Sequence, residues 1–326
     1  MKVVTFGEIM LRLTPPSYGR LLQANSLCAE FAGAEANVAV SLSILGTEST
    51  FVSKLPQNEI GQCAINHLRY YGVDTQFIAR GGDRCGIMFL EKGASQRAGK
   101  VIYDRKYSAI ALASANDFQW DKIFDGAQWF HFTGITPALS ENLAYICEQA
   151  CIAAKKRHLK ISFDPNYRAT LWNKEEARVA LQKLMPYVDI FISNVPQVAD
   201  VLEIYGNSDE EVAASIINKY NCEKVFFTYR KSISASDNVI GGMLFDGKVY
   251  RSRDYSIHII DRVGAGDAFS AGVIHSLLHG FSQKHTIDFA VAASCLKHTI
   301  NGDFNLTSTS EVEALVESDG YNLLQR

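Results

Sequence analysis

Asp261-Arg262-Val263-Gly264-Ala265-Gly266-Asp267-Ala268-Phe269 is the stretch that decides the fold, because it places a glycine-rich turn directly before a predicted helix. The two glycines let the backbone take tight or positive-φ geometry without a clash at Cβ. The first N–H groups of the helix lack intrahelical partners, so they point outward and carry partial positive charge. The turn is therefore predicted to bind an anion, and it suits a phosphate.

Asp267 stands in the first turn of that helix, where an acid would repel a bound phosphate. One interpretation is that Asp267 takes a proton from a hydroxyl group that is about to be phosphorylated. The alternative is an ordinary helix start, whose acid complements the helix dipole. The run at 268–278 is apolar and rich in small residues, which indicates a helix buried against a sheet.

The composition bounds the class of protein. The chain has 326 residues, of which 47% are hydrophobic and 21% charged, so we expect one large domain over 1–326. A net charge of −3 gives no support for a nucleic-acid partner. No apolar run is long enough to predict a membrane span, and the N-terminus is typical of a first strand. The seven scattered cysteines include no Cys-x-x-Cys, which favours reduced thiols, a cytoplasmic location and no bound metal at cysteines or histidines.

Short apolar runs alternate with longer helical patterns along most of the chain. Strands are expected at 3–6, 50–54, 130–133, 161–163, 190–193 and 225–228, and helices at 34–45, 58–71, 141–157, 174–187, 195–205 and 209–220. This alternation at crossover spacing predicts an α/β fold with a mostly parallel central sheet and helices on both faces.

One region departs from this alternation. Residues 85–111 contain two apolar runs, 86–90 and 101–105, separated by a polar, glycine-containing turn at 93–99, which predicts a hairpin. Together with residues 11–30 it is expected to form a small β-sheet lid on the main domain. Lids of this kind close over substrates and exclude water.

Two of these stretches resemble the signatures of a known family, the ribokinase-like (PfkB) carbohydrate kinases. Residues 261–269 resemble its C-terminal signature, and Phe31-Ala32-Gly33-Ala34-Glu35-Ala36-Asn37-Val38-Ala39 resembles its N-terminal one. The resemblance extends from Lys2 to about Asn305. It implies a three-layer ribokinase-like α/β fold with a β-lid, ATP as phosphate donor, Mg²⁺, and a sugar as acceptor.

Within the family, the chain is most similar to the subgroup that phosphorylates the sugar acid 2-keto-3-deoxygluconate. The similarity rests on 33–37, Tyr103-Asp104-Arg105, Phe163-Asp164-Pro165-Asn166-Tyr167-Arg168 and 297–305. It implies transfer of the γ-phosphate of ATP to the primary hydroxyl of a sugar acid. Homo-oligomers that pair through the lid are a further expectation from the family, and an exposed hairpin edge is one that proteins usually cover.

The resemblance also assigns roles to individual residues. Asp267 matches the catalytic base, and the backbone of Gly264, Ala265 and Gly266 matches the anion hole. The substrate-binding positions are Gly33, Asn37, Tyr103, Arg105, Arg168 and Asp303. The nucleotide-binding positions are Asn166, Arg168, Asn194, Thr228, Arg230, Lys231, Ser232, Gly264 and Gly266.

The residues alone leave several of these roles open. Arg168 follows a strand at the edge where such sheets bind ligands, and a guanidinium there can bind a carboxylate or phosphate; it could equally be a solvated surface arginine. Asn37 could be a first-turn helix residue, Asp303 a loop acid, and Tyr103 with Arg105 a cross-strand surface pair. Nothing in the pattern decides between Arg230 and Lys231 as the phosphate contact.

One position departs from the family pattern. Many relatives carry Asn-x-x-Glu where this chain has Asn194-Val195-Pro196-Gln197, and glutamine lacks the negative charge that the water shell of Mg²⁺ prefers. Two alternatives therefore remain beside the 2-keto-3-deoxygluconate kinase. One is a kinase for another sugar, such as fructose or a deoxy-ketogluconate isomer, and the other is a non-catalytic sugar-binding sensor. Arg105 and Arg168, as two cations at the sugar pocket, favour an acid substrate.

Overall fold

The computed structural model of the protein describes residues 1–318. Its strands are β1 Lys2–Phe6, β2 Met10–Thr14, β3 Cys28–Ala32, β4 Glu48–Leu55, β5 Ile78–Arg80, β6 Ile87–Glu91, β7 Lys100–Asp104, β8 Ala127–Thr133, β9 Lys160–Asp164, β10 Ile190–Ser193, β11 Lys224–Ser232, β12 Asp237–Phe245, β13 Val249–Arg251 and β14 Tyr255–His258. Its α-helices are α1 Ala34–Ile44, α2 Glu59–Tyr70, α3 Trp120–Ile123, α4 Ile135–Ala138, α5 Glu141–Lys156, α6 Lys174–Leu184, α7 Val195–Leu202, α8 Asp209–Tyr220, α9 Ala265–Leu278, α10 Gln283–Lys297 and α11 Thr309–Glu317.

The helix starts follow from side chains that the sequence makes visible. Seven helices begin after a Ser or Asn whose side-chain oxygen accepts a hydrogen bond from a backbone N–H in the first turn: Asn58, Ser140, Asn173, Asn194, Ser208, Ser282 and Ser308. Such caps satisfy donors that would otherwise have no partner at a helix start. They explain why α5, α6, α7 and α8 begin at the predicted residues.

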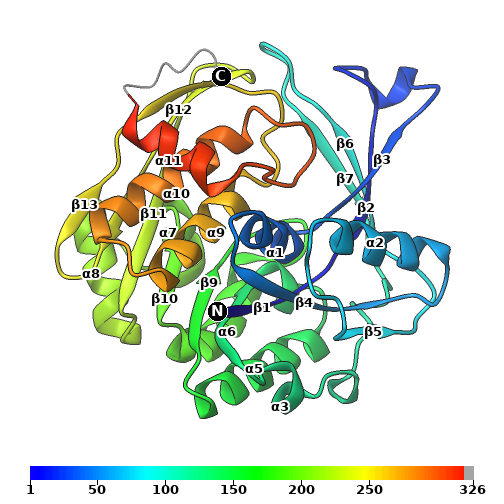
Figure 1. Cartoon of the computed structure of the whole chain (residues 1–326), viewed down its shortest axis with the longest axis horizontal. Coiled ribbons are helices and arrows are strands. Elements are labelled where there is room, and N and C mark those ends of the chain that lie inside the picture. Colours follow the sequence, from blue (N-terminus) through cyan, green and yellow to red (C-terminus); the bar gives the residue numbers. More distant parts are fainter. Residues whose placement is uncertain (319–326) are drawn as a thin grey trace.

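A ten-stranded sheet runs through the molecule in the order β13-β12-β11-β10-β9-β8-β1-β4-β5, with β14 beside β12 (Figure 1). Every pair from β11 to β5 along this order is parallel, so the prediction of a mostly parallel sheet is confirmed. The antiparallel strands β12, β13 and β14 were not predicted. The strand expected at 225–228 also continues to Ser232, because β11 pairs with β12 along that length.

Helices cover both faces of this sheet, and the strand residues alternate between two cores. On β1, Val4 and Phe6 face the core under α5, α6, α7 and α8, whereas Val3 faces the core under α1, α9, α10 and α11. On β10, Phe191 and Ile192 divide in the same way. Burial on both faces explains why these strands are continuously apolar rather than alternating with polar residues. The three layers fit the expected fold.

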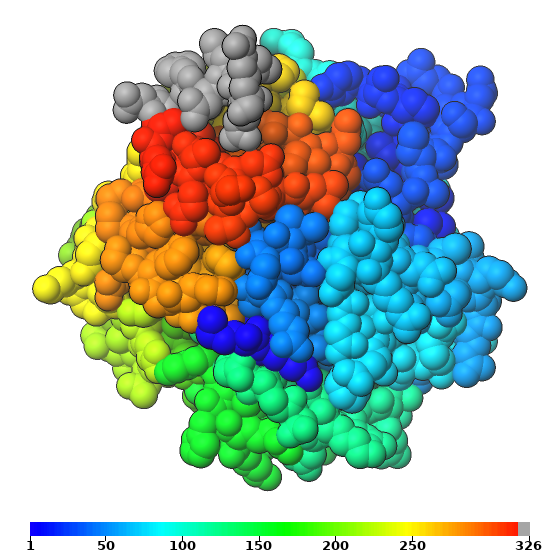
Figure 2. All heavy atoms as spheres, in the orientation of Figure 1, coloured from blue at the N-terminus to red at the C-terminus, as the bar shows by residue number. Residues whose placement is uncertain are grey.

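A separate four-stranded sheet in the order β3-β2-β6-β7 forms the lid. It projects from the body beside α1 and α2, at the upper right of Figures 1 and 2. The predicted hairpin is present as β6 and β7, which pair antiparallel from Ile87 with Asp104 to Glu91 with Lys100. Within the expected lid range 11–30, only the two ends are strand, and the chain between β2 and β3 contains a short 3-10 turn at Leu21–Gln23.

Candidate active site

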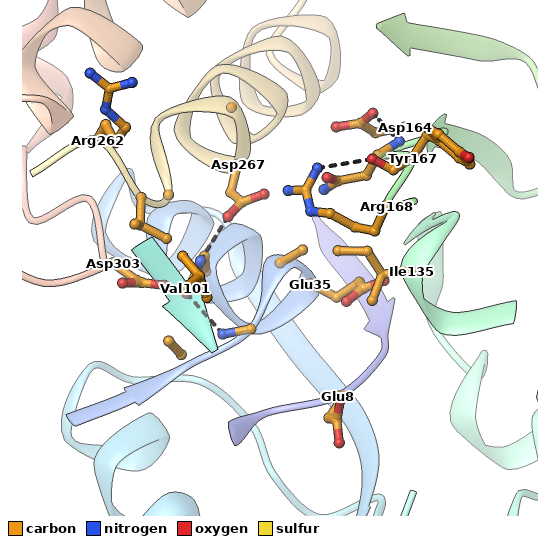
Figure 3. Close-up of a pocket in the computed structure, with 18 of the residues that line it drawn as sticks. Glu8, Glu35, Val101, Ile135, Asp164, Tyr167, Arg168, Arg262, Asp267 and Asp303 are labelled. Carbon is orange, nitrogen blue, oxygen red and sulfur yellow. Dashed lines mark hydrogen bonds between the residues drawn. The ribbon is translucent and has the colours of Figure 1, made fainter. Parts of the chain in front are cut away.

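A cavity of about 680 Å³ lies where the lid meets the edge of the main sheet at which the parallel strands end. Residues from the loop after β1, the starts of α1 and α9, the loop after β9, and strands β7 and β11 line it. In doubly wound folds this edge is where ligands bind. Figure 3 views the cavity with Asp267 between Arg262 on one side and Arg168 on the other.

The predicted glycine turn is present at the start of α9. Gly264 has φ of 85°, and a Cβ atom there would lie 1.9 Å from the carbonyl oxygen of Asp303. Both the left-handed conformation and this close approach require glycine at 264. Gly264, Gly266 and Asp267 all line the cavity, while Ala265 is buried as the first residue of the helix.

Asp267 is held by Asn37, a buried residue near the start of α1. Asn37 Nδ2 donates to Asp267 Oδ2 at 2.7 Å, and Asn37 Oδ1 accepts from the backbone N–H of Gly33 at 3.3 Å. Burial raises the pKa of Asp267 to about 7, with a further upward contribution from the charge of Asp164, whereas the hydrogen bond from Asn37 lowers it. A carboxyl group with a pKa near neutrality is suited to proton transfer.

The loop after β9 carries a second acid and an arginine into the cavity. Asp164 Oδ1 accepts from the backbone N–H of Asn166 at 2.9 Å, and Asn166 has φ of 39°, a conformation that costs strain outside glycine. Burial raises the pKa of Asp164 to about 6. Arg168 Nη1 donates to the carbonyl oxygen of Tyr167 at 3.2 Å. No carboxylate pairs with Arg168 within residues 1–318, so its positive charge is available to a ligand.

Strand alternation places Arg230 and Lys231 on opposite faces of β11, and Ser232 lies at the end of the strand. Thr228 and Arg230 line the cavity, whereas Lys231 and Ser232 are exposed and do not line it. Arg262 also lines the cavity, although no role was expected for it from the sequence. Partial burial lowers the pKa of Arg262, and the neighbouring charge of Arg230 lowers it further. The charge of Asp261 opposes this effect, but neither arginine forms an ion pair within residues 1–318, and two such arginines favour a polyanionic ligand.

Arg105, one of the two cations expected at the sugar pocket, is paired with a carboxylate in the structure. Arg105 Nε donates to Glu8 Oε2 at 2.8 Å, and Arg105 forms an ion pair with the same carboxylate in a buried setting. Ser108 Oγ donates to the other oxygen of Glu8 at 2.6 Å. The guanidinium of Arg105 lies over the ring of Tyr103, 5.2 Å from its centre, and both residues line the cavity. Glu8 therefore balances the charge of Arg105, and Arg168 alone carries the charge argument for an acid substrate.

Three further predicted site residues, Gly33, Asp303 and Asn194, contact other parts of the protein. A Cβ atom at Gly33 would lie 1.9 Å from the carbonyl oxygen of Glu8, so the close approach that requires this glycine is to the chain after β1. Asp303 lines the cavity, but its carboxylate forms an ion pair with Arg12. Asn194 caps α7 by accepting from the backbone N–H of Gln197 at 3.0 Å.

Gln197 has a structural partner that the sequence does not reveal. Its Oε1 accepts from the backbone N–H of Tyr167 at 3.2 Å, which ties the start of α7 to the loop that carries Arg168. The Gln197 side chain therefore helps to position the loop that carries Arg168. It does so without the negative charge that a glutamate would have at this position. Among residues 1–318, no group of three or more His, Cys, Asp or Glu side chains is arranged to hold a metal ion.

Glu35 is a buried acid of the cavity for which no role was expected from the sequence. Its Oε1 accepts from the Thr133 backbone N–H at 3.0 Å, from Thr133 Oγ1 at 2.7 Å and from Thr136 Oγ1 at 2.8 Å. Burial raises its pKa. The position of Glu35 inside the 31–39 signature was the available signal, as was the position of Arg262 two residues before Gly264.

The fold and this site define a carbohydrate kinase. Residues 1–307 match the family described as pfkB family carbohydrate kinase, and the chain belongs to that family. It is similar to the 2-dehydro-3-deoxygluconokinase of Thermotoga maritima, whose crystal structure is 49% identical, has a TM-score of 0.96 and is matched over 98% of both chains. A 2-dehydro-3-deoxygalactonokinase of Haloferax volcanii is 32% identical over 97% of this chain and 96% of its own. The 2-dehydro-3-deoxygluconokinase of Bacillus subtilis is 28% identical over 95% of this chain and 94% of its own.

No helix within residues 1–318 is long and apolar enough to cross a membrane.

Proposed function

We propose that the protein transfers the γ-phosphate of ATP to the primary hydroxyl of 2-keto-3-deoxygluconate, the compound also called 2-dehydro-3-deoxygluconate. The observation that carries the proposal is Asp267, held by Asn37 at 2.7 Å in the first turn of α9 beside the Gly264 turn. This arrangement sets a proton acceptor next to an anion site, which phosphoryl transfer to a hydroxyl requires. The similarity to the kinase of Thermotoga maritima supports the choice of sugar.

Different residues of the cavity have different roles in the proposed reaction. Asp267 in its ionised form accepts the proton of the attacking hydroxyl, and the Gly264–Gly266 backbone stabilises the negative charge of the transferring group. Arg168, the cation without a carboxylate partner, binds the carboxylate of the sugar acid or the phosphate. Asn37, Gly33, Tyr103, Arg105 and Asp303 form the sugar side of the cavity.

The opposite side of the cavity fits the phosphates of ATP, which kinases of this family use. Thr228, Arg230 and Arg262 line it, and the two arginines have no carboxylate partner within residues 1–318. Mg²⁺, when bound to the phosphate oxygens, neutralises part of their charge. Asp164 and Asp267 line the cavity and would be able to hold this ion through its water shell.

A second candidate substrate is the epimeric sugar acid, 2-keto-3-deoxygalactonate. The kinase of Haloferax volcanii that carries that name is 32% identical to this chain. Both acids present a carboxylate to Arg168 and a primary hydroxyl to Asp267, so this pairing favours neither epimer. A neutral sugar such as fructose offers Arg168 no anionic partner. A non-catalytic sensor would have no use for Asp267 as a proton acceptor beside the anion turn.

A substrate panel tests the proposal. The purified protein is assayed with ATP and Mg²⁺ against 2-keto-3-deoxygluconate, 2-keto-3-deoxygalactonate, fructose and ribose, and Asp267→Asn serves as the inactive control. We expect kcat/KM for the gluconate to exceed that for fructose by about 100-fold or more, because fructose leaves Arg168 without an anionic partner. Faster turnover of 2-keto-3-deoxygalactonate than of 2-keto-3-deoxygluconate would make the galactonate the proposed substrate. Absence of turnover with every sugar would favour the sensor.

A further inference from the structure

A buried arginine links the lid to the anion turn, outside the set of residues assigned above. Arg12 lies on β2 of the lid sheet and is 1% exposed. Its Nη2 donates to Asp261 Oδ2 at 2.5 Å, its Nη1 donates to Asp303 Oδ1, and its Nε donates to Thr14 Oγ1 at 3.1 Å. Burying a guanidinium is unfavourable unless its charge is matched, and here two carboxylates match it.

Asp261, the first residue of the stretch that decides the fold, receives a second cation from the lid. Lys92, which follows β6, approaches Asp261 Oδ2 at 3.3 Å and also donates to Asn301 Oδ1 at 2.6 Å. The other carboxylate oxygen of Asp261 accepts from the backbone N–H of Val263 at 3.2 Å. Asp261 therefore connects two lid cations to the residue that precedes Gly264.

Asp303 completes the connection from the opposite side of the turn. Its carbonyl oxygen packs so closely on Gly264 that a Cβ atom there would lie 1.9 Å away. The loop that carries Asp303 is also tied to Asp261, because the backbone N–H of Gly302 donates to Asp261 Oδ2 at 3.3 Å. Arg12 thus holds both segments between which the Gly264 turn is packed.

The lid also forms one wall of the cavity, through Met88 on β6 and Val101 and Tyr103 on β7. A ligand in the cavity consequently contacts the same sheet that carries Arg12 and Lys92. Any movement of this sheet away from the body would draw both cations away from Asp261. Phosphoryl transfer benefits from such a link, since an anion site formed only under a closed lid protects ATP from attack by water.

We propose that Arg12 and Lys92 are positioning residues that set the geometry of the Gly264–Gly266 anion turn through Asp261 when the lid lies against the body. The proposal rests on the kinase function given above. Lys92 is the better residue to test, because its side chain is 15% exposed and its loss leaves Arg12 to balance the two buried acids. Loss of Arg12 itself would leave Asp261 and Asp303 without their main partner and threatens the fold.

The experiment compares Lys92→Met with Lys100→Met, a matched lysine of the same hairpin that is exposed on β7. We expect Lys92→Met to lower kcat at saturating substrates by about ten-fold while KM for ATP stays within about two-fold, because positioning acts on the transition state. Amide hydrogen exchange at 261–266 is expected to quicken in Lys92→Met and to stay unchanged in Lys100→Met. Lys92→Arg is expected to restore both.

An unchanged kcat together with unchanged exchange at 261–266 in Lys92→Met would overturn the proposal, even if the variant melts at a lower temperature. Equal effects in Lys100→Met would also overturn it, since they would reflect a general disturbance of the hairpin. The exchange measurement needs no turnover. If the protein phosphorylates none of the sugars tested, the proposed function fails while the link between Lys92 and the turn is still decided.

Discussion

Asn37 Nδ2 donates to Asp267 Oδ2 at 2.7 Å and so joins the start of α1 to the first turn of α9. The two residues lie 230 positions apart in the sequence, one in each of the two family signatures. A hydrogen bond from an amide favours the ionised carboxylate, and it acts here against the burial that raises the pKa of Asp267 to about 7. Asn37 is therefore expected to set how much of the base is active at neutral pH.

Asn37→Ala should raise the pKa of Asp267 further above 7, because the hydrogen bond that favours the charged form is lost. The acidic limb of the kcat profile should move to higher pH, and kcat at pH 7 should fall by about ten-fold. Measuring kcat from about pH 5.5 to about pH 9 gives the shift of this limb. Asn66→Ala, an exposed asparagine on α2, is the control. A profile that keeps its shape in Asn37→Ala would show that the amide serves the sugar rather than the base.

Asp267→Asn should lower turnover strongly and yet stabilise the fold at alkaline pH. The pKa of Asp267 is raised from 3.8 to about 7 in the folded protein, so the folded state binds the proton more tightly than the unfolded chain. The free energy of unfolding must then fall as pH rises between about 4 and 7. Asparagine at position 267 does not ionise, so the variant avoids this fall in the free energy of unfolding. Urea unfolding should show Asp267→Asn more stable than the parent by about 2 kcal/mol at pH 8 and nearly equal at pH 4.

A fall in kcat of about 10²- to 10⁴-fold is expected for the same variant, with sugar binding retained in calorimetry. Activity near the level of the parent would exclude Asp267 as the base. Stability that is lower than the parent at pH 8 would instead indicate that the ionised carboxylate is satisfied in the folded protein.

Much of the fold is predictable because its signals are local. Strands such as β10 and helices such as α8 stand at the predicted residues, since apolar runs and capping serines or asparagines define both ends. The elements that escape prediction lack a clear apolar pattern. β12 contains Gly241 and Gly242, and a Cβ atom at Gly242 would meet Val291 of α10 at 2.9 Å. α10 is buried over most of its surface, so it shows no apolar stripe.

The site is predictable to the extent that its residues stand in the two signatures or at strand ends. The ion pairs of Arg105 with Glu8 and of Asp303 with Arg12 join positions 97 and 291 residues apart, and no local pattern reveals them. They alter the chemistry, because they remove one cation and one acid from the set free to bind a ligand. The choice of Arg230 over Lys231 as the cavity residue depends on the continuation of β11, which the pairing with β12 determines.

Arg168→Met should lower kcat/KM for a sugar acid far more than for a neutral sugar. Arg168 lines the cavity and forms no ion pair with a carboxylate of residues 1–318, and a charge-assisted hydrogen bond contributes about 1.5–3 kcal/mol. The expected loss for 2-keto-3-deoxygluconate is about 10- to 100-fold. Steady-state kinetics with the acid and with fructose give the comparison. Arg157→Met, at a surface arginine paired with Asp121 and Asp125, controls for loss of a positive charge. Equal losses for both sugars would assign Arg168 to the phosphates alone.

Ile102→Glu should reduce self-association, because we propose that two copies pair through their lids. β3 and β7 are the two edges of the lid sheet. Val101 and Ile102 lie on β7 and Leu22 lies in the turn between β2 and β3, and the three residues are 40%, 43% and 93% exposed. Apolar groups on an unpaired edge favour contact with another chain. Sedimentation velocity should show a dimer or larger species for the parent and a shift toward monomer for Ile102→Glu. Val179→Glu, at a 50% exposed residue of α6 far from the lid in the fold, should leave the distribution unchanged. A parent protein that sediments as a monomer at every concentration would refute pairing through the lid.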